Sequence, residues 1–223
     1  MLSLTTLLVS LAAVAPSVLA DSWGPAFSLG PTTSRIIQAN TTLLPGDPPC
    51  DPKTLLTVWP GMSNGTGDLI QSTVEQWEDN SWCGATSSQW CVRASLFGSF
   101  GQIDGSASAI DGDQNITISY TRSANETWWT QLVTDTATGD ELSTLSHASG
   151  HMTGWGTGTE CDDECVGSTS PQYYYNTVIE LEEADADFSS TAVAGTGVTY
   201  TDMVTADNGK TWTIEKIYLP AMV

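Results

Sequence analysis

Basic side chains are scarce in this sequence, which has 26 Asp and Glu against six Lys and Arg and a net charge of −20. A surface of that charge repels nucleic acid, anionic lipid and acidic polysaccharide, so we expect none of them as a partner. Histidine is also rare, since His147 and His151 in HASGH are the only two. A third metal ligand, such as Glu160, would have to come from elsewhere. We therefore expect loop histidines, no metal and no cofactor.

Long apolar runs are missing apart from residues 7–15, which are too few to span a bilayer. That run leads to the small-residue pattern VLA ahead of Asp21, so residues 1–20 are predicted to be a secretory signal peptide. We expect a protein that is secreted or retained in the lumen of the secretory pathway, with no membrane partner. Candidate glycosylation sites are the N-x-[ST] asparagines Asn40, Asn64, Asn115 and Asn125.

A helical apolar period is also lacking, because no window of 11 or more residues shows a convincing repeat of 3.6. Short segments with a period of two recur instead, separated by Gly, Asp and Asn turns. We predict strands at 55–59, 68–77, 90–100, 107–111, 115–122, 127–135, 141–147, 173–182, 198–204 and 211–219. The pattern indicates an all-β fold, an antiparallel two-sheet β-sandwich or jelly roll.

The length of the chain suits one domain. Residues 21–54 are rich in Pro, Gly and Thr, and we predict an irregular N-terminal arm there. Residues 55–223 are predicted to form a single β-sandwich domain. The oligomeric state is left open by the sequence.

Five cysteines in an oxidising compartment indicate two disulfides and one remaining thiol. Cys83 and Cys91 flank the junction of two β-like runs, and Cys161 and Cys165 bracket the acidic turn CDDEC. We predict local pairing in both cases, which leaves Cys50 as the odd cysteine. A bridge from Cys50 to either hairpin stays open. In a secretory setting these spacings favour disulfides over zinc.

A lone amide among aromatic residues marks the segment WPGMSNGTGDLIQSTVEQW at 59–77. Alternation along the predicted strand places Leu69, Gln71, Thr73, Glu75 and Trp77 on one face of the sheet. Such a mixture of apolar, amide and carboxyl groups is typical of a ligand-binding groove. The alternative is a solvated face with indole rings lying on it.

Two other predicted strands add aromatic, amide and carboxyl groups. By the same alternation Trp129 shares a side with Gln131, whereas Tyr174 shares a side with Asn176 and Glu180. We expect a substrate-binding site lined by Trp59, Trp77, Trp129, Gln131, Tyr174, Asn176 and Glu180.

Three motifs match known sites only by their letters. GMSNG at 61–65 fits G-x-S-x-G, but a nucleophile elbow lies between a parallel strand and a helix, and a strand follows here. DGDQN at 111–115 and ECDDE at 160–164 contain oxygen ligands without the spacing of an EF-hand. We interpret them as a turn and an acidic loop.

The order of a W-x-G-M turn, a Gly/Asp loop and a hydrophobic strand with a glutamine, TVWPGMSNGTGDLIQSTV, resembles the fungal glutamic peptidases, or eqolisins. The resemblance extends weakly through ITISYTR and TATGDEL to YNTVIELEEADADF. It implies a concanavalin-like β-sandwich in which Gln71 matches the catalytic glutamine. The family also needs a glutamate to activate water, but the matching position is Val178, with Glu180 two residues later. Without that base the peptidase mechanism fails.

The same W-x-G-M and DLIQ segments also resemble the fungal hetero-Diels-Alderases of tropolonic sesquiterpenoid biosynthesis. That resemblance implies a cofactor-independent cycloaddition, in which an apolar cavity joins a quinone methide to a terpene alkene. A donor to the heterodiene oxygen would stabilise the charge that grows there. Arg93, which interrupts an apolar run in CVRASLF, is the predicted catalytic donor, with Gln71 beside it. The simpler alternative for Arg93 is a salt bridge to Glu75 or Glu180.

A third class is a noncatalytic, lectin-like β-sandwich that binds a neutral sugar by tryptophan stacking and amide hydrogen bonds. An open, amide-rich groove would favour this class, and a closed, apolar pocket would favour the cycloaddition. The sequence therefore predicts an all-β secreted glycoprotein that binds a small apolar substrate in an aromatic pocket.

Overall fold

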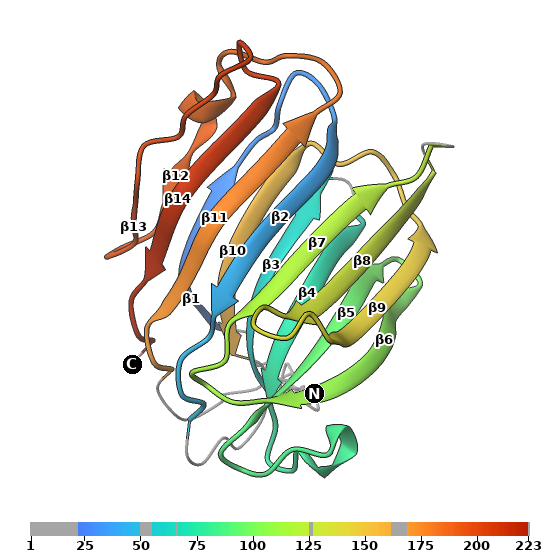
Figure 1. The fold of residues 1–223 in the computed structure, drawn as a ribbon, viewed down its shortest axis with the longest axis vertical. Coiled ribbons are helices and arrows are strands. Elements are labelled where there is room, and N and C mark those ends of the chain that lie inside the picture. Colours follow the sequence, from blue (N-terminus) through green and yellow to red (C-terminus); the bar gives the residue numbers. More distant parts are fainter. Residues whose placement is uncertain (1–21, 50–54, 66, 125–126, 162–168, 223) are drawn as a thin grey trace, which may run out of the picture.

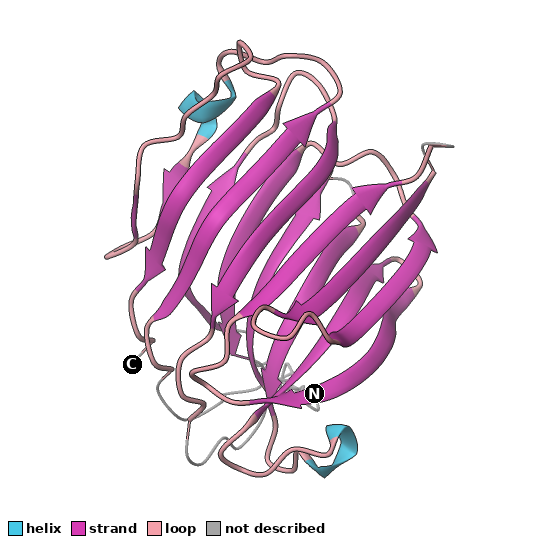
Figure 2. Cartoon of the chain, viewed as in Figure 1, coloured by secondary structure: helices cyan, strands magenta, loops and turns pink. Residues whose placement is uncertain are grey.

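The computed structural model describes residues 22–49, 55–65, 67–124, 127–161 and 169–222. They form two antiparallel sheets of seven strands each, packed face to face as a β-sandwich, which confirms the predicted fold class. Strands dominate the molecule, and the two short 3-10 helices, Ser81–Cys83 and Phe188–Thr191, lie at its ends (Figure 2).

Sheet A, behind the other sheet in Figure 1, has the strand order β12-β1-β10-β3-β4-β5-β6. Its strands, in that order, are Val193–Ala194, Ser22–Leu29, Gly154–Cys161, Leu56–Ser63, Leu69–Gln76, Trp90–Gly98 and Gly101–Ile110. The central strands β3, β4 and β5 are hairpin neighbours in the sequence, whereas β10 comes from far along the chain and pairs with β3 along its whole length.

Sheet B, the front layer of Figure 1, has the order β13-β14-β11-β2-β7-β8-β9. Its strands, in that order, are Thr199–Tyr200, Thr211–Leu219, Gln172–Leu181, Ile36–Leu44, Ile116–Arg122, Trp128–Asp135 and Glu141–Ala148. Strand β2 therefore lies between β11 and β7, at the centre of the sheet.

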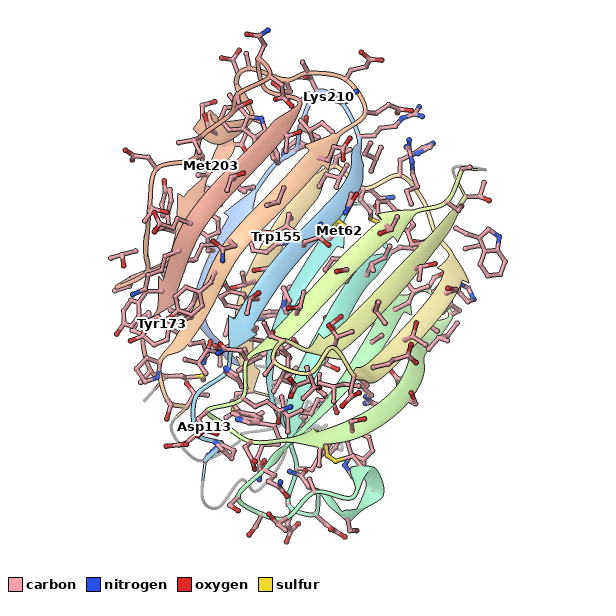
Figure 3. All side chains as sticks on the ribbon, viewed as in Figure 1. Met62, Asp113, Trp155, Tyr173, Met203 and Lys210 are labelled. Atoms are coloured by element: carbon pink, nitrogen blue, oxygen red, sulfur yellow. A yellow bond between two sulfur atoms is a disulfide. The ribbon has the colours of Figure 1, made fainter. Side chains whose placement is uncertain are left out.

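The core consists of the inward-facing residues of both sheets. In β4 the inward residues Ile70 and Val74 are buried, as alternation predicts. Met62 of β3 and Trp155 of β10 lie between the layers near the middle of the molecule (Figure 3).

The prediction of an irregular arm at 21–54 is wrong for most of that segment. Residues 22–29 form β1, beside β10, and residues 36–44 form β2 in sheet B. The arm's proline at position 25 lies where the β1–β10 pairing shifts register, between Trp23 and Ala26, so the strand continues past it. In β2 burial alternates from Ala39 to Leu44, so this Thr-containing segment is a strand with one face in the core.

Strand β10 lies outside the predicted strands, because GWGTGTEC has glycine at three alternate positions. Those glycines face outward, and the alternate residues Trp155, Thr157 and Thr159 face the core. Because glycine has no side chain, the outer face of β10 has no side chains at these positions, which leaves room for a hollow over this strand.

A buried carboxylate connects two loops at one end of the sandwich. Asp185 accepts hydrogen bonds from the hydroxyl of Thr32 at 2.7 Å and from the backbone N–H of Thr33 at 2.8 Å. Burial raises the pKa of the Asp185 carboxyl, but these donors, led by the Thr33 N–H, outweigh the burial and hold the pKa below its usual value.

Asp185→Asn is expected to lower the free energy of unfolding by about 1 to 3 kcal/mol near neutral pH, because hydrogen bonds to the charged form are lost. The folded-state pKa is depressed, so this contribution is present above the unfolded pKa of about 3.9 and is lost as the pH falls through the folded pKa. Urea unfolding of both proteins at neutral and strongly acidic pH measures the difference. Asp187→Asn, on the same loop but exposed, is the matched control. An undiminished difference in acid would contradict this account.

Candidate functional site

The outer face of sheet A carries a groove of about 330 Å³ over its central strands. The groove is lined by Trp23, Leu55, Thr57, Leu69, Gln71, Thr73, Glu75, Phe97, Gln102 and Glu160. The predicted outward face of the strand at 68–77 is therefore the face that lines it. A second hollow, of about 210 Å³, shares Leu69 with the groove and continues over β3 and β10.

Strand register fixes what lies beside Gln71. Gln71 of β4 pairs with Gly61 of β3, and Gly61 pairs with Gly156 of β10, so the three residues form one row across the sheet. A Cβ atom at Gly61 would meet the carbonyl oxygen of Ile70 at 2.8 Å, so a side chain there would clash. The two residues in register with Gln71 on β3 and β10 are therefore glycines, which leave only backbone beside the Gln71 side chain and place no carboxylate in this row.

The Gln71 side chain is 8% exposed and accepts or donates no hydrogen bond within the part of the chain that the structure describes. On one side along the groove it has the apolar pair Leu69 and Phe97, and on the other side Thr73 of its own strand. Across the strand it pairs with Ser95 of β5. An amide with both its donor and its acceptor available, next to apolar side chains, is suited to orient a ligand that has one polar atom.

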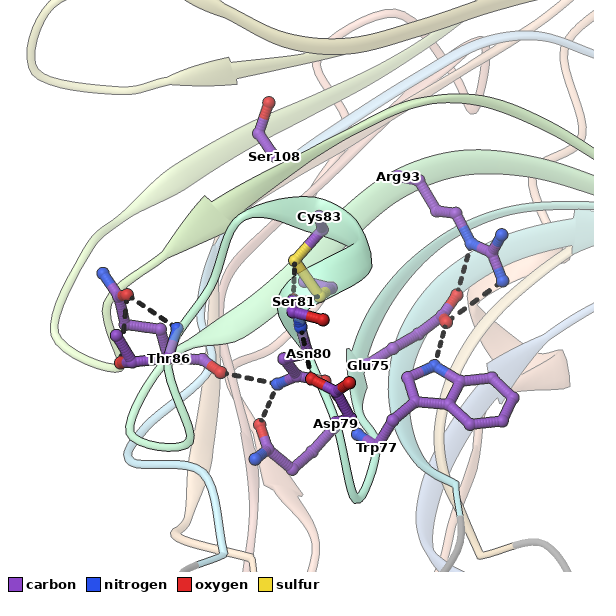
Figure 4. The surroundings of a disulfide bond; sticks show 12 residues. Glu75, Trp77, Asp79, Asn80, Ser81, Cys83, Thr86, Arg93 and Ser108 are labelled. Carbon is purple, nitrogen blue, oxygen red and sulfur yellow. Dashed lines mark hydrogen bonds and ion pairs between the residues drawn. A yellow bond between two sulfur atoms is a disulfide. The ribbon is translucent and has the colours of Figure 1, made fainter.

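Glu75, four residues beyond Gln71, is a carboxylate of the groove with several hydrogen-bond donors around it. It accepts from Arg93 twice, Nε at 2.7 Å and Nη2 at 3.1 Å, and from the Thr73 hydroxyl at 2.6 Å. The indole N–H of Trp77 donates to it at 2.8 Å (Figure 4). Its side chain is 2% exposed, so the charge is buried and compensated where it lies.

All three guanidinium nitrogens of Arg93 are engaged with carboxylates in this arrangement. The Nη1 group binds Asp104 of β6 at 2.6 Å, and the guanidinium lies 5.0 Å from the centre of the Trp82 ring. The alternative prediction of a salt bridge to Glu75 matches this geometry, and Glu180 is not the partner. Arg93 supports Glu75, and Gln71 has the available donor.

A second carboxylate, Glu160 of β10, lines the same groove. Glu160 is in register with Thr57 of β3, and Thr57 is in register with Glu75 of β4. The Glu160 carboxylate accepts a hydrogen bond from the Trp59 indole N–H at 3.2 Å. Glu160 is four residues from Gly156, so it lies two same-face positions away from the row of Gln71. Trp59 packs edge to face against Trp23, with ring centroids 6.1 Å apart. Trp23 lines this groove, and Trp59 lines the second hollow.

Trp77 lies beyond the groove, in a neighbouring hollow of about 390 Å³ that it shares with Glu78, Asp79, Trp82 and Arg93. The ion pair of Arg93 with Glu75 and the Trp77–Glu75 hydrogen bond separate the two spaces. Gln71 and Trp77 thus lie on one face of the sheet but line different hollows.

Three of the predicted lining residues lie in the interior and outside the groove. Trp129 and Gln131 of β8 are 1% and 2% exposed and face sheet A. The Trp129 indole donates to the Gly150 carbonyl at 3.0 Å, and the Gln131 amide donates to the Ser95 carbonyl at 2.7 Å. Tyr174 of β11 is fully buried, and burial raises the pKa of its phenol. These residues pack the core, so the prediction that they contact substrate does not fit their position.

A β-bulge explains why alternation failed on β11. Asn176 has a φ of 50°, and the register with β2 shifts between Tyr175 and Val178. Tyr174 therefore faces inward, while Asn176 and Glu180 both face outward from sheet B. The predicted grouping of Tyr174 with Asn176 and Glu180 is wrong, and Glu180 lies on the sheet opposite Gln71.

The disulfide predicted between Cys83 and Cys91 is present and ties the short helix at 81–83 to β5 (Figure 4). Cys161 also takes part in a disulfide. Cys50 and Cys165 lie outside the described residues, so the predicted pairing of Cys161 with Cys165 is not tested. The Cys83–Cys91 bond agrees with an oxidising compartment.

The sequons occupy varied positions. Asn40 is half-buried on β2, Asn64 is half-buried in the loop after β3, and Asn115 is exposed before β7, whereas Asn125 lies outside the described residues. Within the described ranges, no group of three or more His, Cys, Asp or Glu is arranged to hold a metal ion. None of the helices in that part of the chain is long and apolar enough to cross a bilayer.

No family model matches the sequence, and no curated protein matches it. Among solved structures the chain is similar to scytalido-glutamic peptidase in complex with a peptide-based transition-state analogue, and to the same enzyme with a transition-state analogue inhibitor. In both comparisons the TM-score is 0.52, the identity is 16%, and the match covers 86% of this chain and 97% of the peptidase chain. The chain therefore has a β-sandwich fold of the glutamic-peptidase type.

Proposed function

We propose that the groove around Gln71 binds a small, largely apolar molecule and accelerates a hetero-Diels-Alder cycloaddition by confinement. The observation that carries the proposal is that the Gln71 amide is available beside Leu69 and Phe97, while Glu75 is fully engaged. The other polar lining residues, Thr57, Thr73, Gln102 and Glu160, are the feature that favours the lectin-like alternative. A cycloaddition of a quinone methide with an alkene forms one C–C and one C–O bond without loss of an atom. It therefore needs orientation and one hydrogen-bond donor, and no general base.

Confinement supplies most of the expected rate enhancement. Holding diene and dienophile in a near-attack pose contributes on the order of 7 to 11 kcal/mol in the best oriented systems. The Gln71 amide N–H would donate to the quinone methide oxygen, where negative charge grows in the transition state. Leu69, Phe97 and the glycine floor at Gly61 would contact the terpene part of the substrate.

Gln71→Leu is expected to slow adduct formation about tenfold, the value of one net hydrogen bond of roughly 1.4 kcal/mol. The assay mixes the purified protein with a quinone methide generated in situ and a humulene-type alkene, and follows adduct and enantiomer ratio by chiral chromatography. Gln38→Leu, a half-buried glutamine on the outer face of sheet B, is the matched control and should react as the unchanged protein does. A rate no higher than that of the uncatalysed mixture would remove the proposal.

Proteolysis is the second candidate, because Gln71 lies in the groove of a glutamic-peptidase-type fold. Two placements argue against proteolysis, which needs a glutamate beside the glutamine. The residue of β10 in register with Gln71 is Gly156, and Glu180 lies on sheet B. We expect no cleavage of acid-denatured haemoglobin. Cleavage that disappears in both Gln71→Ala and Glu160→Gln would favour the peptidase instead, with Glu160 as the base.

A further inference from the structure

A small hollow of about 290 Å³ lies on sheet B at the edge formed by β11, β13 and β14, far around the sandwich from Gln71. It is lined by Tyr173, Thr199, Tyr200, Thr201, Lys216 and Tyr218. Tyr173 lies at the lower left of the front sheet in Figure 3. The hollow has no part in the function proposed for the groove.

Strand register arranges these side chains as an array. Tyr218 pairs with Tyr173 on one side and with Thr199 on the other. In the next outward row Lys216 pairs with Tyr175. Thr201 lies beside Lys216: its backbone N–H donates to the Lys216 carbonyl, and its hydroxyl accepts from the Lys216 N–H at 3.1 Å. The array therefore places a cation and tyrosine rings at the centre, with threonine hydroxyls along one edge.

Lys216 is held over aromatic rings rather than by an acid. Its ammonium lies 4.7 Å from the centre of the Tyr173 ring and 5.9 Å from that of Tyr175, within range of cation–π attraction. Within the part of the chain that the structure describes, no carboxylate forms an ion pair with it. In a chain with a net charge of −20, a cation without a carboxylate partner is well placed to receive an anionic ligand.

The rings and hydroxyls specify the rest of the ligand. Tyr173 and Tyr175 stack with planes 9° apart, and the Tyr218 ring lies 5.3 Å from that of Tyr173. Tyr200, in register with the buried Ile217, packs its ring on Phe27 at 4.7 Å. Tyrosine faces beside such a hollow accept the C–H face of a pyranose, and the hydroxyl of Thr199 can bond one of its hydroxyl groups. The Thr201 hydroxyl is bonded to the Lys216 backbone. We propose that this hollow binds a single hexuronate unit, with the carboxylate on Lys216 and the ring against tyrosine.

Size and charge limit the ligand to one acidic unit. The volume of the hollow is at the lower end of ligand sites, enough for one ring. A polyuronate would bring further carboxylates against a strongly acidic surface, which repels them. A monosaccharide, or the acidic end of a neutral oligosaccharide, avoids that repulsion.

The test is titration of the unmodified protein with D-glucuronate, D-glucose and benzoate, followed by saturation-transfer NMR and calorimetry. We expect glucuronate to bind at least fivefold more tightly than glucose. Lys216→Gln should remove that preference, and Tyr173→Leu should weaken both sugars. Lys210→Gln, which changes another exposed lysine away from the hollow, is the matched control and should leave binding unchanged.

Three results would overturn the proposal: equal binding of glucuronate and glucose, an equal effect of Lys210→Gln, or benzoate binding more tightly than glucuronate. The last would mark the hollow as a site for aromatic acids. Thermal unfolding of each variant separates loss of binding from loss of fold. Gln71→Leu should not alter glucuronate binding, so failure of the function proposed for the groove leaves this test intact.

Discussion

Arg93→Met is expected to lower the free energy of unfolding by about 3 to 5 kcal/mol, because it leaves a buried carboxylate without its cation. Glu75 would keep the Thr73 hydroxyl and the Trp77 indole, but both are neutral donors. Asp104 would lose a partner as well, although it is closer to solvent. Urea unfolding, followed by the circular dichroism of the sheets, measures the change.

A double-mutant cycle separates the ion pair from packing. Glu75→Met added to Arg93→Met removes the uncompensated charge, so most of the lost stability should return. Arg35→Met is the matched control, since Arg35 is 45% exposed and lies 3.7 Å from Glu182. That change should cost no more than about 1 kcal/mol. If Arg93→Met lowered the free energy of unfolding no more than Arg35→Met does, the Arg93–Glu75 ion pair would not be stabilising the fold.

Trp129→Ala is expected to lower the free energy of unfolding by about 3 to 5 kcal/mol, the range for truncating a large buried aromatic side chain. The indole is 1% exposed and donates to the Gly150 carbonyl, so both packing and a hydrogen bond would be lost. Chemical unfolding of the purified variant gives the value.

The neighbouring residue gives the control for this prediction. Trp128 is 45% exposed on the other face of the same strand, and Trp128→Ala should change the free energy of unfolding by roughly 0.5 kcal/mol or less. The contrast tests core placement directly, because a pocket wall at position 129 would tolerate truncation with a loss of binding only. Similar effects at the two positions would place Trp129 at the surface.

Period-two alternation was sufficient to predict most of the fold and one side of the groove. It identified β4, its inward residues Ile70 and Val74, and the outward series that includes Gln71 and Glu75. It missed β10, whose alternate residues are glycines with no hydrophobic signal, and therefore missed Glu160 as a lining residue. The sequence signal for this strand was the alternation of glycine with Trp155, Thr157 and Thr159 in GWGTGTEC.

Sequence alone did not reveal which sheet each strand joins. Trp129 and Gln131 share a face, as predicted, but that face is the interior, because an amide can be buried once the Ser95 carbonyl of the other sheet accepts its hydrogen bond. Tyr174 was misplaced for a different reason, since the bulge at Asn176 breaks the alternation within one strand. Both errors depend on contacts between segments far apart in the chain.

The bulge at Asn176 divides β11 into two halves that are out of phase by one residue. If β11 instead alternated regularly through Asn176, either Tyr174 or the pair Ile179 and Leu181 would have to turn to solvent. The inserted residue thus lets tyrosines on one half face outward, toward Lys216, while the other half keeps its aliphatic residues inside. One left-handed asparagine decides which side chains that strand shows to water.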